Sequence, residues 1–470
     1  MSSPQQASSE STAQPGTGPP ISPLTSRPLD GPGPTQIPGQ PSPRPSTDRA
    51  SHLDDLEKSL PIDTIPSPSL NPPPPAAAKP HGEVACTEAA GDEQPARPRL
   101  PLRRRLAHFT WAWYTLTMST GGLALLIDAQ PHQFPGLRQI GLAVYALIAA
   151  LFALVTSALA ARFALFPGLL AASLAHPREG FFFPTAFLSL ATLITSTQRY
   201  CVRADDADPE APGALLGAIR AAFWAYVALA TGVAVGQYSY VFAAHRLGLQ
   251  AMMPTWILPI FPIMLSGTIA SVVSETQPAA ARVSIVVAGL TCQGLGLAVA
   301  SMMCAHMVGR LMQSGLPHRE HRPGLFVCVG PPAFTALALI GLARGLPADL
   351  DHDRDGLLDA AIAEIMAVAG AGFLWALSLW WFGIALLAVA RAPPRCFHLG
   401  WWAAVFPNTG FALATIALGT VFRSEGVLWF ATAMSVLLAL AYCFVLYHHV
   451  RAVVLQDIMY PGRDEDVEDQ

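Results

Sequence analysis

The feature that most constrains this chain is a long apolar segment that contains proline. Residues 401–419 read WWAAVFPNTGFALATIALG, which is long enough to cross a bilayer at about 20 residues per crossing. Proline removes a backbone hydrogen bond and leaves a carbonyl free. Such a carbonyl is tolerated at membrane depth only where protein or a water-filled cavity satisfies it. We therefore expect this segment to face inward, toward neighbouring helices or a pore.

Segments of this kind recur at a nearly constant spacing. The prolines concerned are Pro184, Pro259, Pro262, Pro331 and Pro407. Pro259 follows Pro184 by 75 residues, Pro331 follows Pro259 by 72, and Pro407 follows Pro331 by 76. Such a period indicates a repeated supersecondary unit. A plainer hydrophobic segment follows each one, so the unit is a helical hairpin. The first apolar segment has Gly121 and Gly122 in place of proline, and we expect helix kinks at all these positions.

The composition is that of a membrane protein. Hydrophobic residues make up 52% of the 470 and charged residues only 13%, against about 25% charged in soluble proteins. We therefore predict an all-α membrane protein with five hairpins around a central pore, in which five inner kinked helices are ringed by five outer ones. The ten predicted transmembrane segments are 107–128, 138–164, 181–200, 217–242, 253–275, 282–309, 323–345, 357–391, 398–421 and 424–450.

Polar segments flank this domain, which we place at residues 101–452. Residues 1–100 contain 22 of the 43 prolines and cannot bury enough apolar surface to fold alone, so we expect a disordered Pro/Ser-rich tail. Residues 453–470 form a short acidic tail. Basic loop residues set membrane orientation. With a cytoplasmic N-terminus, twelve arginines lie in or beside cytoplasmic loops and seven outside, so both termini are predicted to be cytoplasmic.

The sequence lacks the patterns typical of an enzyme, a metal site or a nucleic-acid surface. Glu364 is the one acid well inside a predicted segment, and His108 and His306 stand apart with no HxxxH or HExxH spacing. The seven cysteines include no CxxC pair, which argues against a zinc site. No basic patch is interleaved with aromatics. We expect no enzymatic activity, no cofactor, no metal and no nucleic-acid partner.

A permeation path agrees better with the inner segments. Broken helices turn backbone dipoles and hydroxyl groups toward a lumen, although each hydroxyl can instead bond a carbonyl of its own helix. Acids are scarce there, whereas arginines such as Arg162 and Arg199 stand at segment ends. This favours an anion over a cation, unless the arginines only snorkel to the interface. The pore or substrate-binding candidates are Thr185, Ser266, Thr268, Thr335, Asn408, Thr409 and Arg199.

Four phenylalanines lie at or near the prolines. They are Phe183, Phe261, Phe334 and Phe406. An aromatic ring at such a place can plug a pore, and it can equally be part of ordinary helix packing. The residues alone leave both readings open.

Five stretches carry a family resemblance. They are HFTWAWYTLTMSTGGLALL, QPHQFPGL, WILPIFPIMLSGTIA, RPGLFVCVGPPAFTALALIG and WWAAVFPNTGFALATIALG. Together they resemble the tellurite-resistance/dicarboxylate transporter family of the voltage-dependent anion channel superfamily, and most of all its fungal malate permeases. The family also includes plant slow anion channels and fungal sulfite efflux pumps. The resemblance covers residues 108–451 and none of the first hundred.

The resemblance implies a ten-helix pore, a homo-oligomer (dimer or trimer) and a pore-blocking phenylalanine. WWAAVFP matches the family's gate region, which makes Phe406 the first gate candidate, and Phe334 of GPPAFT the second. It also implies transport of malate, succinate and fumarate across the plasma membrane, with protons as a candidate coupled ion. Two alternatives stay open. One is another small anion such as sulfite or chloride, and the other is a membrane receptor or scaffold that transports nothing.

Overall fold

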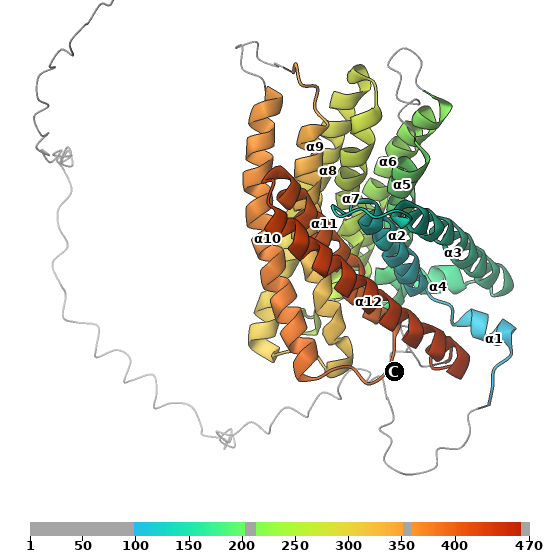
Figure 1. Cartoon of the computed structure of the whole chain (residues 1–470). Helices are drawn as coiled ribbons and strands as arrows, with labels where there is room; N and C mark the ends of the chain where they lie inside the picture. The colour runs from blue at the N-terminus through green and yellow to red at the C-terminus, as the bar shows by residue number, and fades with distance from the viewer. Residues whose placement is uncertain (1–97, 203–212, 351–358, 462–470) are drawn as a thin grey trace, which may run out of the picture. The chain divides into compact units, whose positions relative to one another are not determined.

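The computed structural model describes residues 98–202, 213–350 and 359–461 (Figure 1). These residues form helices and their connections, with no β-strand among them, so the predicted all-α class is confirmed for this part of the chain. Most of the predicted tail at 1–100 and the acidic residues 462–470 lie outside the described residues. The boundaries proposed for those tails therefore stay predictions.

Exposed and buried helices alternate along the chain. The outer helices are α3 (Leu137–Leu165), α6 (Ala214–Ala244), α8 (Ala279–Ser314), α10 (Asp359–Arg391) and α12 (Glu425–Leu455). The inner helices are α2 (Tyr114–Asp128), α5 (Thr185–Cys201), α7 (Phe261–Val273), α9 (Gly330–Arg344) and α11 (Phe406–Val421). The most apolar stretch of each outer helix has 17% to 33% of its residues buried, against 67% to 94% in the segments that end with α5, α7, α9 and α11.

The five inner helices contact one another in a closed ring. α2 packs against α5, α5 against α7, α7 against α9, α9 against α11, and α11 against α2. Each outer helix packs against the inner helices that precede and follow it, and α12 closes the circle by contacting α11 and α2. The outer surfaces are strongly apolar, with Phe373 79% and Leu437 66% exposed. Apolar area on this scale is suited to contact with lipid or protein rather than water.

Nine helical segments among the described residues are long and apolar enough to cross a membrane. The expected first segment, 107–128, is not one of them. It corresponds to the short 3₁₀ helix η1 (Trp111–Trp113) and to α2, which has 15 residues. At about 1.5 Å per residue α2 extends roughly 22 Å, less than the hydrocarbon thickness of about 30 Å. Buried hydroxyl residues in α2, such as Thr117 and Ser119, also lower its hydropathy.

Every inner helix is preceded by a 3₁₀ helix, and we call each such pair an inner segment. The other 3₁₀ helices are η2 (Glu179–Phe182), η5 (Pro254–Ile260), η7 (Arg319–Val329) and η8 (Leu399–Ala404). Pro184 directly precedes α5, and Pro262, Pro331 and Pro407 are the second residues of their helices, while Pro259 lies within η5. A proline in the first turn loses no intrahelical bond. The four prolines other than Pro259 therefore mark where 3₁₀ winding changes to α, rather than kinks inside a continuous α-helix.

The two glycines of the first inner segment have a different role. α2 continues as an α-helix through Gly121 and Gly122. A Cβ at Gly121 would overlap the Thr192 side chain, and one at Gly122 would lie 2.6 Å from Oγ1 of Thr409. The absence of side chains lets α5 and α11 approach α2 closely.

The ends of the described domain lie together. Arg105, on the short helix α1 (Leu102–Ala107), donates from Nη2 to the Val453 carbonyl at 2.7 Å. The backbone N–H of Leu100 donates to Oε1 of Gln456 at 3.0 Å. The remaining short helices are α4 (Leu169–Ala175), η4 (Leu249–Ala251) and η6 (Ser274–Thr276).

Candidate permeation pathway

Two small cavities lie within the ring of inner helices. Residues from all five inner segments line each of them, and neither lining includes a charged residue. Cavity 1 has a volume of about 40 Å³ and cavity 2 of about 20 Å³. One water molecule needs about 10–15 Å³ on this scale. The axis of the ring therefore has room for a few waters and is closed to a small organic anion.

Phe406 separates the two cavities. It is the one residue that lines both, and its side chain is almost fully buried, with 2% exposed. Phe334 lines cavity 2 and stacks on Phe406, with ring centroids 5.1 Å apart and planes 29° apart. The two sequence-predicted gate candidates thus form one aromatic pair across α9 and α11, at the point where the cavities are interrupted.

Three of the predicted hydroxyl residues line these cavities. Thr185 lines cavity 1, and Thr268 and Thr409 line cavity 2. The Thr185 hydroxyl donates to carbonyls of Phe182 and Trp111, and the Thr409 hydroxyl donates to a carbonyl within its own helix. The Thr268 hydroxyl has no hydrogen-bond partner among the described residues. It is the one predicted lining residue with a donor already free.

The other predicted polar residues of the inner helices do not line either cavity. Ser266 lies against Cys292 of α8. Thr335 accepts a hydrogen bond at 2.7 Å from Nε2 of Gln293, which is also on α8. Asn408 is buried and donates to the Ala404 carbonyl at 2.8 Å. Successive residues of an α-helix point about 100° apart, so close neighbours in sequence face different directions.

Arg199 also lies away from both cavities. Its Nε is 3.9 Å from the Asp128 carboxylate, and its Nη1 is 3.7 Å from the carboxylate of Glu275. The side chain is 40% exposed. Arg199 therefore links the ends of α2, α5 and η6 through two acids, and it lines neither cavity.

Four further threonines line the cavities and were missed by the proline pattern. Thr115 and Thr255 line cavity 1, and Thr192 and Thr195 line cavity 2. On α5, Thr192 and Thr195 follow Thr185 by seven and ten residues. This is the spacing of one face of an α-helix. The same spacing counted from Thr185 would have identified Thr192 and Thr195 from the sequence.

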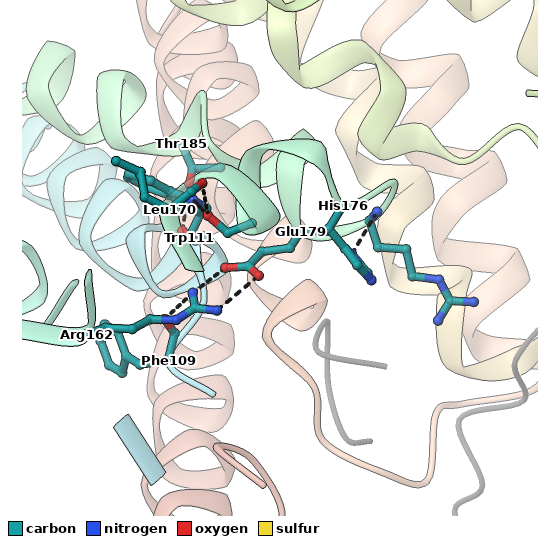
Figure 2. Close-up of polar contacts among 9 residues, drawn as sticks. Phe109, Trp111, Arg162, Leu170, His176, Glu179 and Thr185 are labelled. Atoms are coloured by element: carbon teal, nitrogen blue, oxygen red, sulfur yellow. Dashed lines mark hydrogen bonds and ion pairs between the residues drawn. The ribbon is translucent and has the colours of Figure 1, made fainter. Parts of the chain in front are cut away.

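A buried ion pair fixes the start of the second inner segment (Figure 2). Nη1 of Arg162 on α3 lies 2.5 Å from Oε1 of Glu179, and Nη2 lies 3.3 Å from Oε2. Nη1 also donates to the Phe109 carbonyl at 2.9 Å. The Arg162 and Glu179 side chains are only 3% and 5% exposed. Arg162 therefore does not snorkel to the interface, and neither does it contact either cavity.

A larger cavity adjoins cavity 1, and we call it the basic vestibule. Its volume is about 710 Å³. It shares four lining residues with cavity 1, namely Phe182, Thr255, Gly324 and Gly400. The vestibule, cavity 1, Phe406 and cavity 2 thus follow one another in that order. Within the part of the chain that the structure describes, no group of three or more His, Cys, Asp or Glu could hold a metal ion.

A closed ring of five inner helices with an interrupted, uncharged axis defines a channel-like membrane protein, and comparison with known proteins identifies its family. The profile of the voltage-dependent anion channel family matches residues 108–450. The chain therefore belongs to this family, as its sequence motifs led us to expect. At the family level this makes it a multi-pass membrane protein that conducts or transports small anions, rather than an enzyme.

The more similar relatives are named as malate transporters. The malic acid transport protein of Schizosaccharomyces pombe is 36% identical over 374 residues, which cover 78% of this chain and 84% of that protein. A putative malic acid transport protein of the same organism is 32% identical over 79% of this chain and 86% of its own length. The sulfite efflux pump of Trichophyton rubrum is more distant, at 26% identity over 68% of this chain and 84% of its own length.

Proposed function

We propose that this protein transports C4-dicarboxylate anions, chiefly malate and also succinate and fumarate, across the plasma membrane. The observation that carries the substrate is the 36% identity to a malic acid transport protein along most of both chains. The uncharged axis is compatible with it, because the free hydroxyl of Thr268 can hydrogen-bond a carboxylate without trapping it. We further propose that α2 with η1 crosses the membrane as a tenth segment and that both termini are cytoplasmic.

In this proposal the structure represents a closed state, and Phe406 is the gate. The cavities on its two sides hold only a few waters, and the ring of Phe406 is their common wall. A hydrophobic constriction blocks an ion because the ion would have to shed its hydration shell there. Displacement of the Phe406 ring joins the two cavities into one path. Phe334 packs on that ring and holds it in place.

The membrane potential gives the transport a favoured direction. With the inside negative, export of a dianion lowers its electrical free energy by roughly 4–5 kcal/mol per 100 mV, from about 2.3 kcal/mol per charge. Export therefore needs no coupling, whereas uptake against this potential needs a protonated form of the acid or a coupled proton. We also propose a homo-oligomer, a dimer or trimer, for which the apolar outer faces offer contact area.

The test is uptake of labelled malate into liposomes that contain the purified full-length protein. Voltage and pH gradients are imposed separately, and excess succinate, sulfite or chloride is added as competitor. We expect malate flux that succinate blocks and sulfite does not. A sulfite or chloride current without malate flux would instead support the second candidate, a small-anion channel. The 26% identity to a sulfite efflux pump is the observation that favours this candidate. No flux of any anion from folded protein would favour a receptor or scaffold.

The gate is tested by Phe406→Ala, which should raise malate flux severalfold at equal surface expression because it removes the wall between the cavities. Phe261→Ala is the matched control. Phe261 is equally buried, at 2% exposure, and lines cavity 1 alone, so its loss enlarges one cavity without connecting the two. Flux that is unchanged or lost in Phe406→Ala, or raised equally in Phe261→Ala, would count against the gate.

A further inference from the structure

The basic vestibule has the size and charge of an anion-binding site. Its volume of about 710 Å³ falls within the roughly 300–1,000 Å³ typical of small-molecule sites. Three arginines and four histidines are among its lining residues, and no Asp or Glu of the described chain lines it. A cavity lined by one sign of charge raises the local concentration of the opposite ion. The axial cavities, in contrast, contain no charged lining residue.

Two of its arginines have no acidic partner. Arg246 follows the end of α6, and Arg310 lies in the last part of α8. Neither forms an ion pair with any described residue. Nε of Arg310 donates to the Gln250 carbonyl at 3.4 Å. This bond holds the Arg310 side chain against the connection that follows α6, which also contains Arg246. Both residues line the vestibule, and both contribute positive charge that no described acid compensates.

Histidines provide further hydrogen-bonding groups around this wall. The rings of His321 and His398 are 6.1 Å apart at their centroids, and Nε2 of His398 bonds the Glu320 carbonyl. Arginine keeps its charge at all physiological pH values. The permanent charge of the vestibule therefore comes from its arginines.

We infer that the basic vestibule is the docking site of the dicarboxylate, in which Arg246 and Arg310 each bind one carboxylate before the anion reaches the constriction at Phe406. This inference rests on the proposed function. A guanidinium presents a planar pair of donors that matches a carboxylate. Two such groups distinguish a dicarboxylate from a monocarboxylate, because the latter engages only one of them.

The first test is calorimetric binding of malate and of lactate to the purified full-length protein in detergent. The variants are Arg246→Gln, Arg310→Gln and the double variant. Each loss should weaken malate binding about tenfold, the usual scale for a hydrogen bond to a charged group, and weaken lactate binding less. Arg310 also bonds a backbone carbonyl, so its replacement can disturb the fold. Arg246 is exposed, so Arg246→Gln carries little such risk. Arg246→Lys keeps the charge and should recover part of the affinity.

Arg451→Gln is the matched control. Arg451 is exposed on α12 and does not line the vestibule, so the variant removes the same charge elsewhere. It should bind malate like the wild type. Unchanged malate affinity in the double variant, or an equal loss in Arg451→Gln, would overturn the docking site and leave the proposed transport untouched.

Liposome flux separates docking from gating. The double variant should raise the KM for malate with kcat within about twofold of wild type, whereas Phe406→Ala should change kcat with little effect on KM. A fall in kcat with unchanged KM in the double variant would refute docking. Arginine-dependent malate binding without any flux would retain the docking site and reject the proposed transport. No malate binding by folded wild-type protein would reject the docking site.

Discussion

Breaking the buried ion pair between Arg162 and Glu179 should destabilise the protein strongly. Glu179→Gln keeps the size of the side chain but leaves the Arg162 guanidinium, 3% exposed, without its counter-charge. The Phe109 carbonyl, 2.9 Å from Nη1, remains as its partner but compensates no charge. Removing one member of a buried ion pair costs about 3–5 kcal/mol, because the other charge stays buried. We expect a loss of that size in the free energy of unfolding.

The contrast with Asp128→Asn makes the prediction quantitative. Asp128 also faces an arginine, but its distance to Arg199 is 3.9 Å and the two side chains are 27% and 40% exposed. Ion pairs that water reaches contribute about 0–1 kcal/mol. The assay is unfolding of the purified variants in the same detergent, followed by intrinsic fluorescence against temperature and denaturant.

A double replacement tests whether the loss of unfolding free energy comes from the Arg162 charge that stays buried without its partner. Substituting both partners with apolar residues, as in Arg162→Met with Glu179→Met, should recover much of the stability lost in Glu179→Gln, because no charge stays buried. If Glu179→Gln destabilises no more than Asp128→Asn, the reasoning from burial is wrong. If the double replacement is less stable than Glu179→Gln alone, the pair matters through its hydrogen-bond geometry instead.

Two smaller predictions concern the axial cavities. Phe334→Ala should raise malate flux less than Phe406→Ala, because Phe334 lines only cavity 2; equal single effects in the liposome assay would mean that the two rings block together. Thr268→Val should lower malate turnover without loss of thermal stability, since the Thr268 hydroxyl has no partner to lose. Thr195→Val is its control, because that hydroxyl donates to the Ala191 carbonyl. Equal malate turnover in the two variants would show that the free Thr268 hydroxyl has no role in transport.

The recurrence of proline predicted where four of the five inner helices begin, because it marks a local change in helix winding. Each of Pro184, Pro262, Pro331 and Pro407 stands where a 3₁₀ helix passes into an α-helix. The sequence could not distinguish this junction from a kink inside one helix, because proline is compatible with both. The alternation of plain and proline-containing segments likewise identified the outer and inner helices.

The site was harder to predict, because closeness to proline is not the same as facing the axis. Thr268 lines cavity 2, whereas Ser266, two residues earlier, lies against α8. Two residues rotate an α-helix by about 200°. Counting steps of three and four residues from one lining position would have assigned the face. It would not have found the partner of Arg162, because the contact with Glu179 depends on how the connection after α3 folds back.

The separation of charge from the gate has a consequence for selectivity. A dianion pays a large desolvation penalty in a narrow uncharged passage, and most hydroxyls along this passage, such as those of Thr185, Thr192 and Thr409, already donate to backbone carbonyls. The axis can therefore oppose the passage of any anion, but it offers little to distinguish one from another. Under the docking proposal, discrimination by charge number occurs in the vestibule, where the arginine side chains are gathered. Transport rate and substrate preference should accordingly respond to different residues, with Phe406 governing the first, and Arg246 with Arg310 the second.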